Sequence, residues 1–296
     1  MPTAQLDDRA VIRIAGADAG ALLQNVVTLD MVAVDRHGSG YGALLTPQGK
    51  ILWDFVLHRL ADGYAADVRS DQAEQFGRRL SLYRLRAKVE IAVAPDLAVF
   101  VNWSDDAGHP ATNPSATPFP QPGSETPNDP RLAKLGRRWV APAGSVKTDA
   151  AAKDWHRHRI ALAIPEGGVD FVFGDAFPHD AGMDSLHGIA FDKGCYVGQE
   201  VVSRMRHRGT ARRRIVALAS DAAFPEPGTE IVAGARPLGR LGSSAGSHAI
   251  GLVRLDRLRA ALDAGARVQA GSATLEAKLP EWATYGWPAL APAGGD

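Results

Sequence analysis

Along the N-terminal half, the spacing of apolar residues changes between short continuous runs, typical of strands, and the recurrence every three to four residues that is typical of helices. This pattern predicts strands that alternate with helices. Residues 9–15 form a short apolar run, and the turn at 16–18 opens a segment in which apolar residues recur at helical spacing over 22–27. This change is typical of a strand followed by a helix. The runs 41–45 and 51–57 are separated by Thr-Pro-Gln-Gly, which predicts a β-hairpin because Pro and Gly favour a tight turn. Hairpins alternating with helices indicate an α+β unit, not a doubly wound sheet.

Two further helices are predicted from polar residues that can cap them. Ser70 or Asp71 precedes the apolar positions of 76–83, and Asp149 precedes the helix-forming residues 150–163. A hydroxyl or carboxylate at such a place accepts a hydrogen bond from an unpaired N–H of the first helical turn. We therefore expect a capped helix in each of these segments.

The C-terminal part has a different pattern, with short apolar runs separated by Gly and Pro turns. These runs lie at 215–219, 230–232, 250–253, 267–269 and 274–277. Runs of this length and spacing predict strands of a small β-barrel. We therefore predict two domains, an α+β region over 1–211 and a β-barrel over 212–296. A loop rich in Pro, at about 104–131, interrupts the first domain.

Composition and charge exclude several classes of protein. The 296 residues are 45% hydrophobic, and 33 Lys and Arg residues balance 33 Asp and Glu residues. No overall field therefore attracts nucleic acid or an anionic membrane, and we expect neither as a partner. No stretch approaches the roughly 20 apolar residues of a membrane span, and residues 1–10 lack the pattern of a signal peptide. We expect a soluble, cytoplasmic protein.

The sequence contains one cysteine, Cys195, so it can form no internal disulfide and no cysteine-rich zinc site. No HExxH pattern occurs either, and we predict no resident metal. Glycine flanks the segment around the thiol, and 198–204 has the spacing of a helix, so the thiol precedes a helix N-terminus. The helix dipole and Lys193 would both favour a thiolate, which predicts Cys195 and Lys193 as the chemically active pair. The alternative is a buried, structural cysteine.

The octet Lys-Gly-Cys-Tyr-Val-Gly-Gln-Glu at 193–200 resembles the signature of the YgfZ family, including its mitochondrial iron-sulfur assembly relatives. Other segments resemble the family as well. They are 16–18, 23–24, 27–30, 46–50, 83–89, 207–214, 239–241 and 251–254. The resemblance covers essentially the whole chain apart from the Pro-rich loop.

The resemblance implies a fold and a function. The superfamily includes the aminomethyltransferase of the glycine cleavage system, which implies α+β lobes around a central folate-sized opening and a C-terminal antiparallel β-barrel. The family implies a bacterial protein that binds tetrahydrofolate or another reduced folate and supports assembly or repair of iron-sulfur enzymes. Its partners would be iron-sulfur enzymes or assembly factors. The transferase usually carries an acidic residue where Cys195 stands, so we expect no glycine cleavage activity.

The resemblance also suggests where a folate would bind. A pterin ring requires an apolar face and an acceptor for the N–H donors on its edge. Trp155 stands at a pterin-contacting aromatic position of the family, the alternative being a helix residue packed in the core. Asp180 stands where relatives often have Glu or Gln and would receive the pterin edge, through a water because its side chain is shorter. Arg9 stands where some relatives have Trp. The remaining predicted folate contacts are Tyr196, Gln199, Glu200 and Arg204.

Six arginines and His207 are concentrated in 204–214. This run is either a solvated junction, or a site for the glutamate tail of folate or an acidic partner, or a nucleic-acid site, and the absence of aromatic residues disfavours the last. Two other functions remain open. One is a folate-dependent aminomethyl or other one-carbon transferase, and the other is a non-catalytic interaction module on the same fold.

Overall fold

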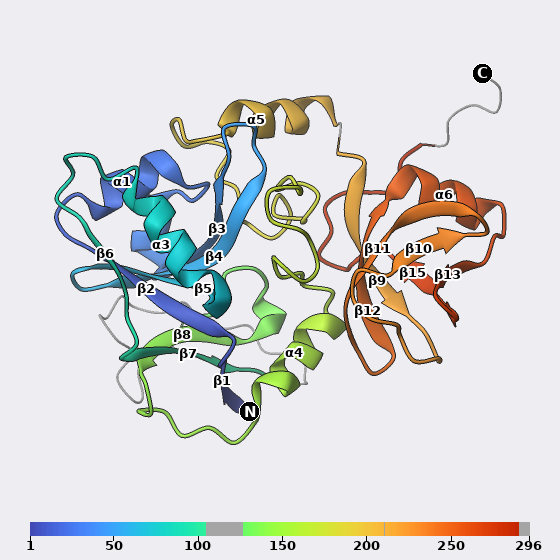
Figure 1. The fold of residues 1–296 in the computed structure, drawn as a ribbon, viewed down its shortest axis with the longest axis horizontal. Coiled ribbons are helices and arrows are strands. Elements are labelled where there is room, and N and C mark those ends of the chain that lie inside the picture. The colour runs from blue at the N-terminus through green and yellow to red at the C-terminus, as the bar shows by residue number, and fades with distance from the viewer. Residues whose placement is uncertain (105–126, 210, 290–296) are drawn as a thin grey trace. The chain divides into compact units, whose positions relative to one another are not determined.

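The computed structural model describes residues 1–104, 127–209 and 211–289 (Figure 1). The chain divides into two compact units, the first of Met1–Trp155 and Leu186–Ser203, the second of His156–Ser185 and Arg204–Asp296. Most of the Pro-rich loop predicted at 104–131 lies outside the described residues.

A five-stranded antiparallel sheet forms the centre of the first unit. Its strands, in spatial order, are β3 (Ser39–Leu45), β4 (Ile51–Leu60), β5 (Gly63–Arg69), β2 (Arg9–Ala15) and β6 (Glu90–Val93). The predicted strand at 9–15 and the predicted hairpin are confirmed. The hairpin turn is closed by a bond from the Thr46 N–H to the Lys50 carbonyl oxygen, and Gly49 adopts a φ of 77° that favours glycine.

Three helices cover one face of this sheet: α1 (Ala19–Val26), α2 (Met31–His37) and α3 (Ala73–Ser81) (Figure 1). Their apolar faces pack on alternate residues of the strands, as period-2 and period-3.6 patterns require. Phe76 of α3, for example, contacts Phe55 of β4 with a ring-centre distance of 5.3 Å, and both rings are fully buried. The helix expected over 22–27 is confirmed.

The cap predicted for α3 is wrong, although the helix itself is present. Ser70–Gln72 form a 3-10 turn, η1, and Gln72 is the N-cap of α3 with no side-chain hydrogen bond to the helix. The Asp71 carboxylate pairs instead with Arg69, at 3.0 Å. A guanidinium offers this carboxylate a charge-assisted bond, which is stronger than a bond to a backbone N–H.

A second sheet of the first unit was not predicted. It has the order β1 (Thr3–Gln5), β7 (Leu97–Asn102), β8 (Arg137–Pro142). From β8, Arg138 donates to the Asp67 carboxylate in β5 at 2.6 Å, and Arg9 of β2 donates to the same carboxylate at 2.6 Å. Burial would raise the pKa of Asp67, but the two guanidinium groups hold it well below its usual value. The two sheets are therefore joined by a buried ionic group.

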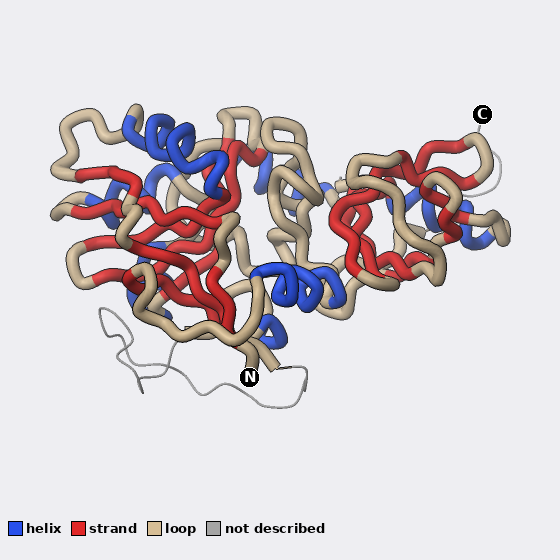
Figure 2. Tube along the Cα trace, turned by 60° about the horizontal axis from the view of Figure 1, so that its bottom comes forward, coloured by secondary structure: helices blue, strands red, loops and turns tan. Residues whose placement is uncertain are grey.

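The β-barrel predicted for the C-terminal part of the chain is confirmed, within the second unit (Figure 2). Seven strands form a near-closed antiparallel sheet in the order β14, β13, β10, β11, β12, β9, β15. Their bounds are β9 (Arg213–Ala219), β10 (Glu230–Ala233), β11 (Arg236–Ala245), β12 (His248–Arg254), β13 (Val268–Ala270), β14 (Ala273–Thr274) and β15 (Glu276–Lys278). Strand β11 and helix α6 (Leu255–Asp263), which packs on β11 and β12, were not predicted.

The remaining helices are η2 (Ala133–Leu135), α4 (Ala152–Ala161) and α5 (Gln199–Arg208). The helix expected over 150–163 corresponds to α4, and the helix expected from residue 198 corresponds to α5. Among the described residues, no helix combines the length and the apolar character that crossing a bilayer requires.

Candidate functional site

The structure brings the octet together with a segment far away in the sequence, residues 27–30. Lys193 donates from Nζ to the carbonyl oxygens of Val27, at 2.8 Å, and of Leu29. Thr28 donates from Oγ1 to the Gly188 carbonyl oxygen at 2.7 Å, and the Ala190 N–H donates to the Thr28 carbonyl oxygen at 2.9 Å. The chain entering the octet is therefore held along its length against the loop between α1 and α2.

The octet also packs on the turn between β3 and β4, which the sequence had marked by Thr-Pro-Gln-Gly. Gly198 has a φ of 82°, and a Cβ placed there would lie 2.6 Å from the Thr46 carbonyl oxygen. A Cβ on Gly49 would lie 2.9 Å from Cβ of Val201. Both glycines are therefore needed for close approach as well as for a positive φ. Three motifs found in the sequence thus meet at one place.

Cys195 lies in the middle of this arrangement, and its side chain is exposed. The alternative interpretation, a buried structural cysteine, is therefore wrong. A free thiol on a loop that is anchored at both ends can reach a ligand or partner without rearrangement of the core.

Lys193 is partly buried and does more than supply positive charge. Burial lowers the pKa of its ammonium to about 8, while the Asp30 carboxylate opposes this change. The Lys193 Nζ also lies 5.2 Å from the centre of the Tyr196 ring. With two carbonyl oxygens and this ring as neighbours, Lys193 fixes the path of the octet. Its predicted catalytic role remains a prediction.

The other octet residues differ in exposure. Tyr196 is 7% exposed, and burial raises the pKa of its hydroxyl to about 12. Gln199 begins α5 and is half-buried, whereas Glu200 and Arg204 on the same helix are exposed. The exposed pair offers a carboxylate and a guanidinium one helical turn apart. Tyr196, by contrast, is buried, and its predicted contact with folate remains a prediction.

Trp155 is fully buried in α4. The guanidinium groups of Arg138 and Arg131 lie 5.1 and 5.7 Å from its ring centre. This burial matches the alternative interpretation, in which Trp155 is a packed helix residue. A ring in this state meets a ligand only after neighbouring side chains have moved.

Asp180, the predicted acceptor for a pterin edge, is also buried. Its Oδ2 accepts from Nη2 of Arg213 at 2.8 Å and from the Phe177 N–H at 3.0 Å. Arg213 pairs with Asp175 as well, and Arg214 pairs with Asp184 at 2.8 Å. Two arginines of the run 204–214 are thus engaged in ion pairs of the second unit, while Arg204 and Arg206 are exposed.

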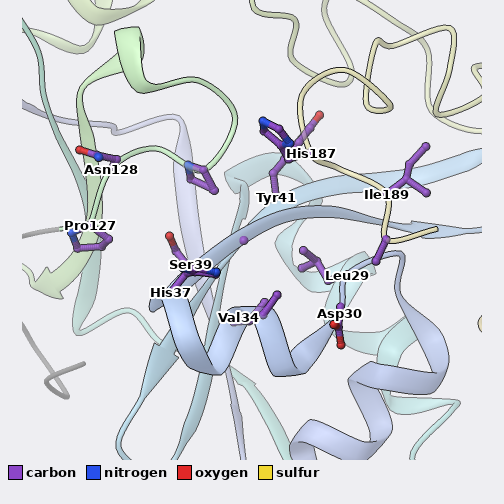
Figure 3. A pocket seen from close by; sticks show the side chains of 14 residues that line it. Leu29, Asp30, Val34, His37, Ser39, Tyr41, Pro127, Asn128, His187 and Ile189 are labelled. Atoms are coloured by element: carbon purple, nitrogen blue, oxygen red, sulfur yellow. The ribbon is translucent and has the colours of Figure 1, made fainter. Parts of the chain in front are cut away.

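A pocket of about 380 Å³ opens in the first unit beside the edge strand β3 (Figure 3). The walls come from α2, β3 and two loops, and the lining residues are Leu29, Asp30, Ala33, Val34, His37, Ser39, Gly40, Tyr41, Pro127, Asn128, Pro130, His187, Ile189 and Ala190. Figure 3 shows Tyr41 and His187 on one side of the pocket and Leu29 and Ile189 on another. The volume of this pocket and its combination of apolar and polar lining residues are typical of small-molecule sites.

This pocket adjoins the motif cluster, because Leu29 and Asp30 belong to the segment that Lys193 holds. Asp30 caps α2, where its carboxylate accepts from the Val32 N–H at 3.2 Å. None of the predicted folate contacts lines the pocket. His37, Tyr41 and His187 carry no local sequence signal, since they come together only through the tertiary fold.

Comparison with known proteins finds a matching family model and several sequence relatives of this chain. Residues 212–285 match the family described as CAF17, C-terminal beta-barrel domain. Human iron-sulfur cluster assembly factor IBA57, mitochondrial, is 26% identical over 97% of this chain and 85% of its own length. The homologue from Pyricularia oryzae is 33% identical over 71% of this chain and 55% of its own length, so the chain spans about half of that relative.

A solved structure shows the same fold. The glycine cleavage system aminomethyltransferase T from Bartonella henselae matches 94% of this chain and 84% of its own, with a TM-score of 0.64 and 15% identity. That likeness concerns the fold alone, and it confirms the expected α+β architecture. The octet, the barrel and the sequence relatives together show that the chain belongs to the IBA57/YgfZ family, as a homologue of iron-sulfur cluster assembly factor IBA57.

Proposed function

We propose that this protein binds a reduced folate and supports the assembly or repair of iron-sulfur enzymes. The observation that carries the proposal is the exposed Cys195, held on a loop that two other family motifs anchor. An exposed thiol is a soft ligand and, as thiolate, a nucleophile, so it suits contact with a cluster or with a thiol-bearing partner. The named relatives are assembly factors, which supports the same role here.

The aminomethyltransferase-like fold is compatible with folate. We place the pterin in the pocket beside β3, because Leu29 and Ile189 offer apolar surface and Asp30 offers a carboxylate among the lining residues. Binding at Trp155 or Asp180 would require displacement of their arginine neighbours.

The chemistry available at the loop comes from this chain's own residues. Lys193 orients the octet through two carbonyl oxygens, and its lowered pKa of about 8 leaves a fraction of the amine neutral near neutral pH. Such an amine can accept a proton from a group that reaches the loop. Cys195 supplies the thiol. We further propose a cytoplasmic location, whereas the named relatives are mitochondrial.

A second candidate is a one-carbon transferase, favoured by the fold likeness to aminomethyltransferase T. Cys195 stands where the transferase usually has an acidic residue, so glycine cleavage activity should be absent. Ammonia release from an aminomethylated lipoyl carrier, above a no-enzyme control, would instead favour this second function. The third candidate, a non-catalytic interaction module, predicts no folate binding at all.

Calorimetric titration with tetrahydrofolate tests the binding. We expect saturable binding by the wild-type protein and strong loss in Ile189→Asp, which puts a charge into the pocket wall. Val32→Ala is the matched control, because Val32 is 64% exposed on α2 and does not line the pocket. Absence of saturable binding at millimolar tetrahydrofolate would reject the folate proposal. Equal affinity in the Ile189 and Val32 variants would place the pterin elsewhere.

A further inference from the structure

The loop between α3 and β6 displays a leucine to solvent in an unfavourable backbone conformation. Leu85 is 88% exposed, the largest exposed fraction among the large hydrophobic side chains of the described residues. Its φ is 46°, in the left-handed region that a branched apolar side chain rarely adopts. Leu82, three residues earlier, is 67% exposed. Neither apolar burial nor backbone preference therefore explains the presence of leucine at position 85.

Hydrogen bonds hold this loop firmly in place. The Ala87 N–H donates to the Arg84 carbonyl oxygen at 2.8 Å, and the Lys88 N–H donates to Oδ2 of Asp18 at 2.7 Å. A Cβ on Gly16 would lie 2.2 Å from the Lys88 carbonyl oxygen, so the loop packs tightly on the start of α1. The strained conformation is thus imposed by the surrounding structure, as is typical of functional sites.

Cationic residues flank the exposed leucine in the sequence. Arg84, Arg86 and Lys88 are exposed, and within the described part of the chain none of the three forms an ion pair. On the helix that precedes the loop, by contrast, the exposed Arg78 pairs with Glu74 at 2.9 Å. In a chain without net charge, the loop is a local positive surface with an apolar centre. We call Leu82, Arg84, Leu85, Arg86 and Lys88 the knob.

We propose that the knob is a docking site for a partner protein whose surface carries carboxylates around an apolar depression. The apolar centre matches the anchor of a protein interface, and the surrounding cations match a carboxylate rim. A rigid anchor loses little conformational entropy on binding, which accounts for a strained and fixed loop. An ordinary solvated surface requires neither the leucine nor the left-handed backbone. The proposal does not depend on folate binding or on Cys195.

Leu85→Gly separates docking from folding, because glycine adopts a φ of 46° without strain. We expect the melting temperature of this variant to lie within a few degrees of the wild-type value, or above it. A photoreactive benzoylphenylalanine at position 86 serves as the probe in cells of the source organism, with the same residue at position 172 as control, since Val172 is also exposed, at 65%. We expect a discrete protein adduct from position 86 only, with the crosslinked partner peptide flanked by Asp or Glu.

The adduct should disappear in Leu85→Gly and in the double variant Arg84→Glu with Lys88→Glu, and both should still fold by circular dichroism. An adduct that persists in both variants would overturn the proposal, as would the absence of any adduct specific to position 86. Co-sedimentation with vesicles of phosphatidylglycerol and phosphatidylcholine tests the other occupant of a basic apolar surface. If the wild-type protein sediments with the vesicles and both variants do not, the knob binds a membrane. That result would contradict a protein partner.

Discussion

The Nζ of Lys193 lies 2.8 Å from the carbonyl oxygen of Val27, a residue 166 positions earlier in the chain. This bond ties the octet to the loop that forms one wall of the pocket, because the lining residues Leu29 and Asp30 belong to the same loop as Val27. The thiol loop and the pocket are therefore mechanically connected. A ligand that moves the pocket wall would also act on the segment that carries Cys195.

The lowered pKa of Lys193 predicts a specific pH dependence of stability. Its pKa is about 8 in the folded protein, below the ordinary value of 10.5, so between these values the unfolded chain binds more protons. Stability contributed by this group therefore rises as pH increases from about 8 to 10.5, and is lowest below 8. Urea unfolding from about pH 7 to about pH 10 should show this rise in wild type and lack it in Lys193→Met. If the stability of wild type and of Lys193→Met changed with pH in the same way, the rise could not be due to a lowered pKa of Lys193.

Gly198 should be intolerant of any side chain. Alanine at this position must adopt a φ of 82° and place its Cβ 2.6 Å from the Thr46 carbonyl oxygen, so we expect a loss of about 2–4 kcal/mol. Gly144→Ala is the matched control, because Gly144 has a φ of 75° and no other group lies within 4 Å of the place its Cβ would take. The control should lose only about 1 kcal/mol. Equal losses by urea unfolding would show that the octet is not packed on the hairpin turn.

The buried Asp67 predicts a strong effect on stability. Asp67→Asn leaves two buried guanidinium groups without their carboxylate, which should cost about 3–5 kcal/mol at neutral pH. Because the folded pKa of Asp67 is depressed, its contribution is complete above about pH 4 and is lost as pH falls toward the folded pKa. The exposed pair Asp71–Arg69 is the control, and Asp71→Asn should change stability by less than about 1 kcal/mol. Similar losses in both variants would contradict this ranking.

Local pattern was sufficient for much of the fold. The strand at 9–15, the first hairpin and the barrel strands β9, β10 and β12 have clear periodicity and turn residues, and the structure confirms them. Strand β11 was not predicted because it contains Pro237 and two glycines, residue types that are uncommon inside strands. The cap of α3 was wrong because a nearby guanidinium competes for Asp71, and such competition depends on geometry.

The candidate site was only partly predictable. The octet is visible in the sequence, and the structure shows Cys195 exposed, but the bonds from Lys193 to residues 27 and 29 arise from the tertiary fold. Trp155 and Asp180 have residue types that suit a pterin, yet arginine side chains already contact them. The local sequence does not show which polar or aromatic residue will contact an arginine in the folded chain. The pocket beside β3 is likewise formed by segments distant in sequence.

The exchange of one sulfur for oxygen at position 195 tests the central claim most directly. In cells that lack this protein, the activity of iron-sulfur enzymes is measured after complementation with wild type or with Cys195→Ser. Because the side chain is exposed, the serine variant should fold with a stability within about 1 kcal/mol of wild type. We predict that wild type restores the activity and that the equally abundant serine variant does not. Full restoration by Cys195→Ser would contradict a role for the thiol in iron-sulfur enzyme assembly.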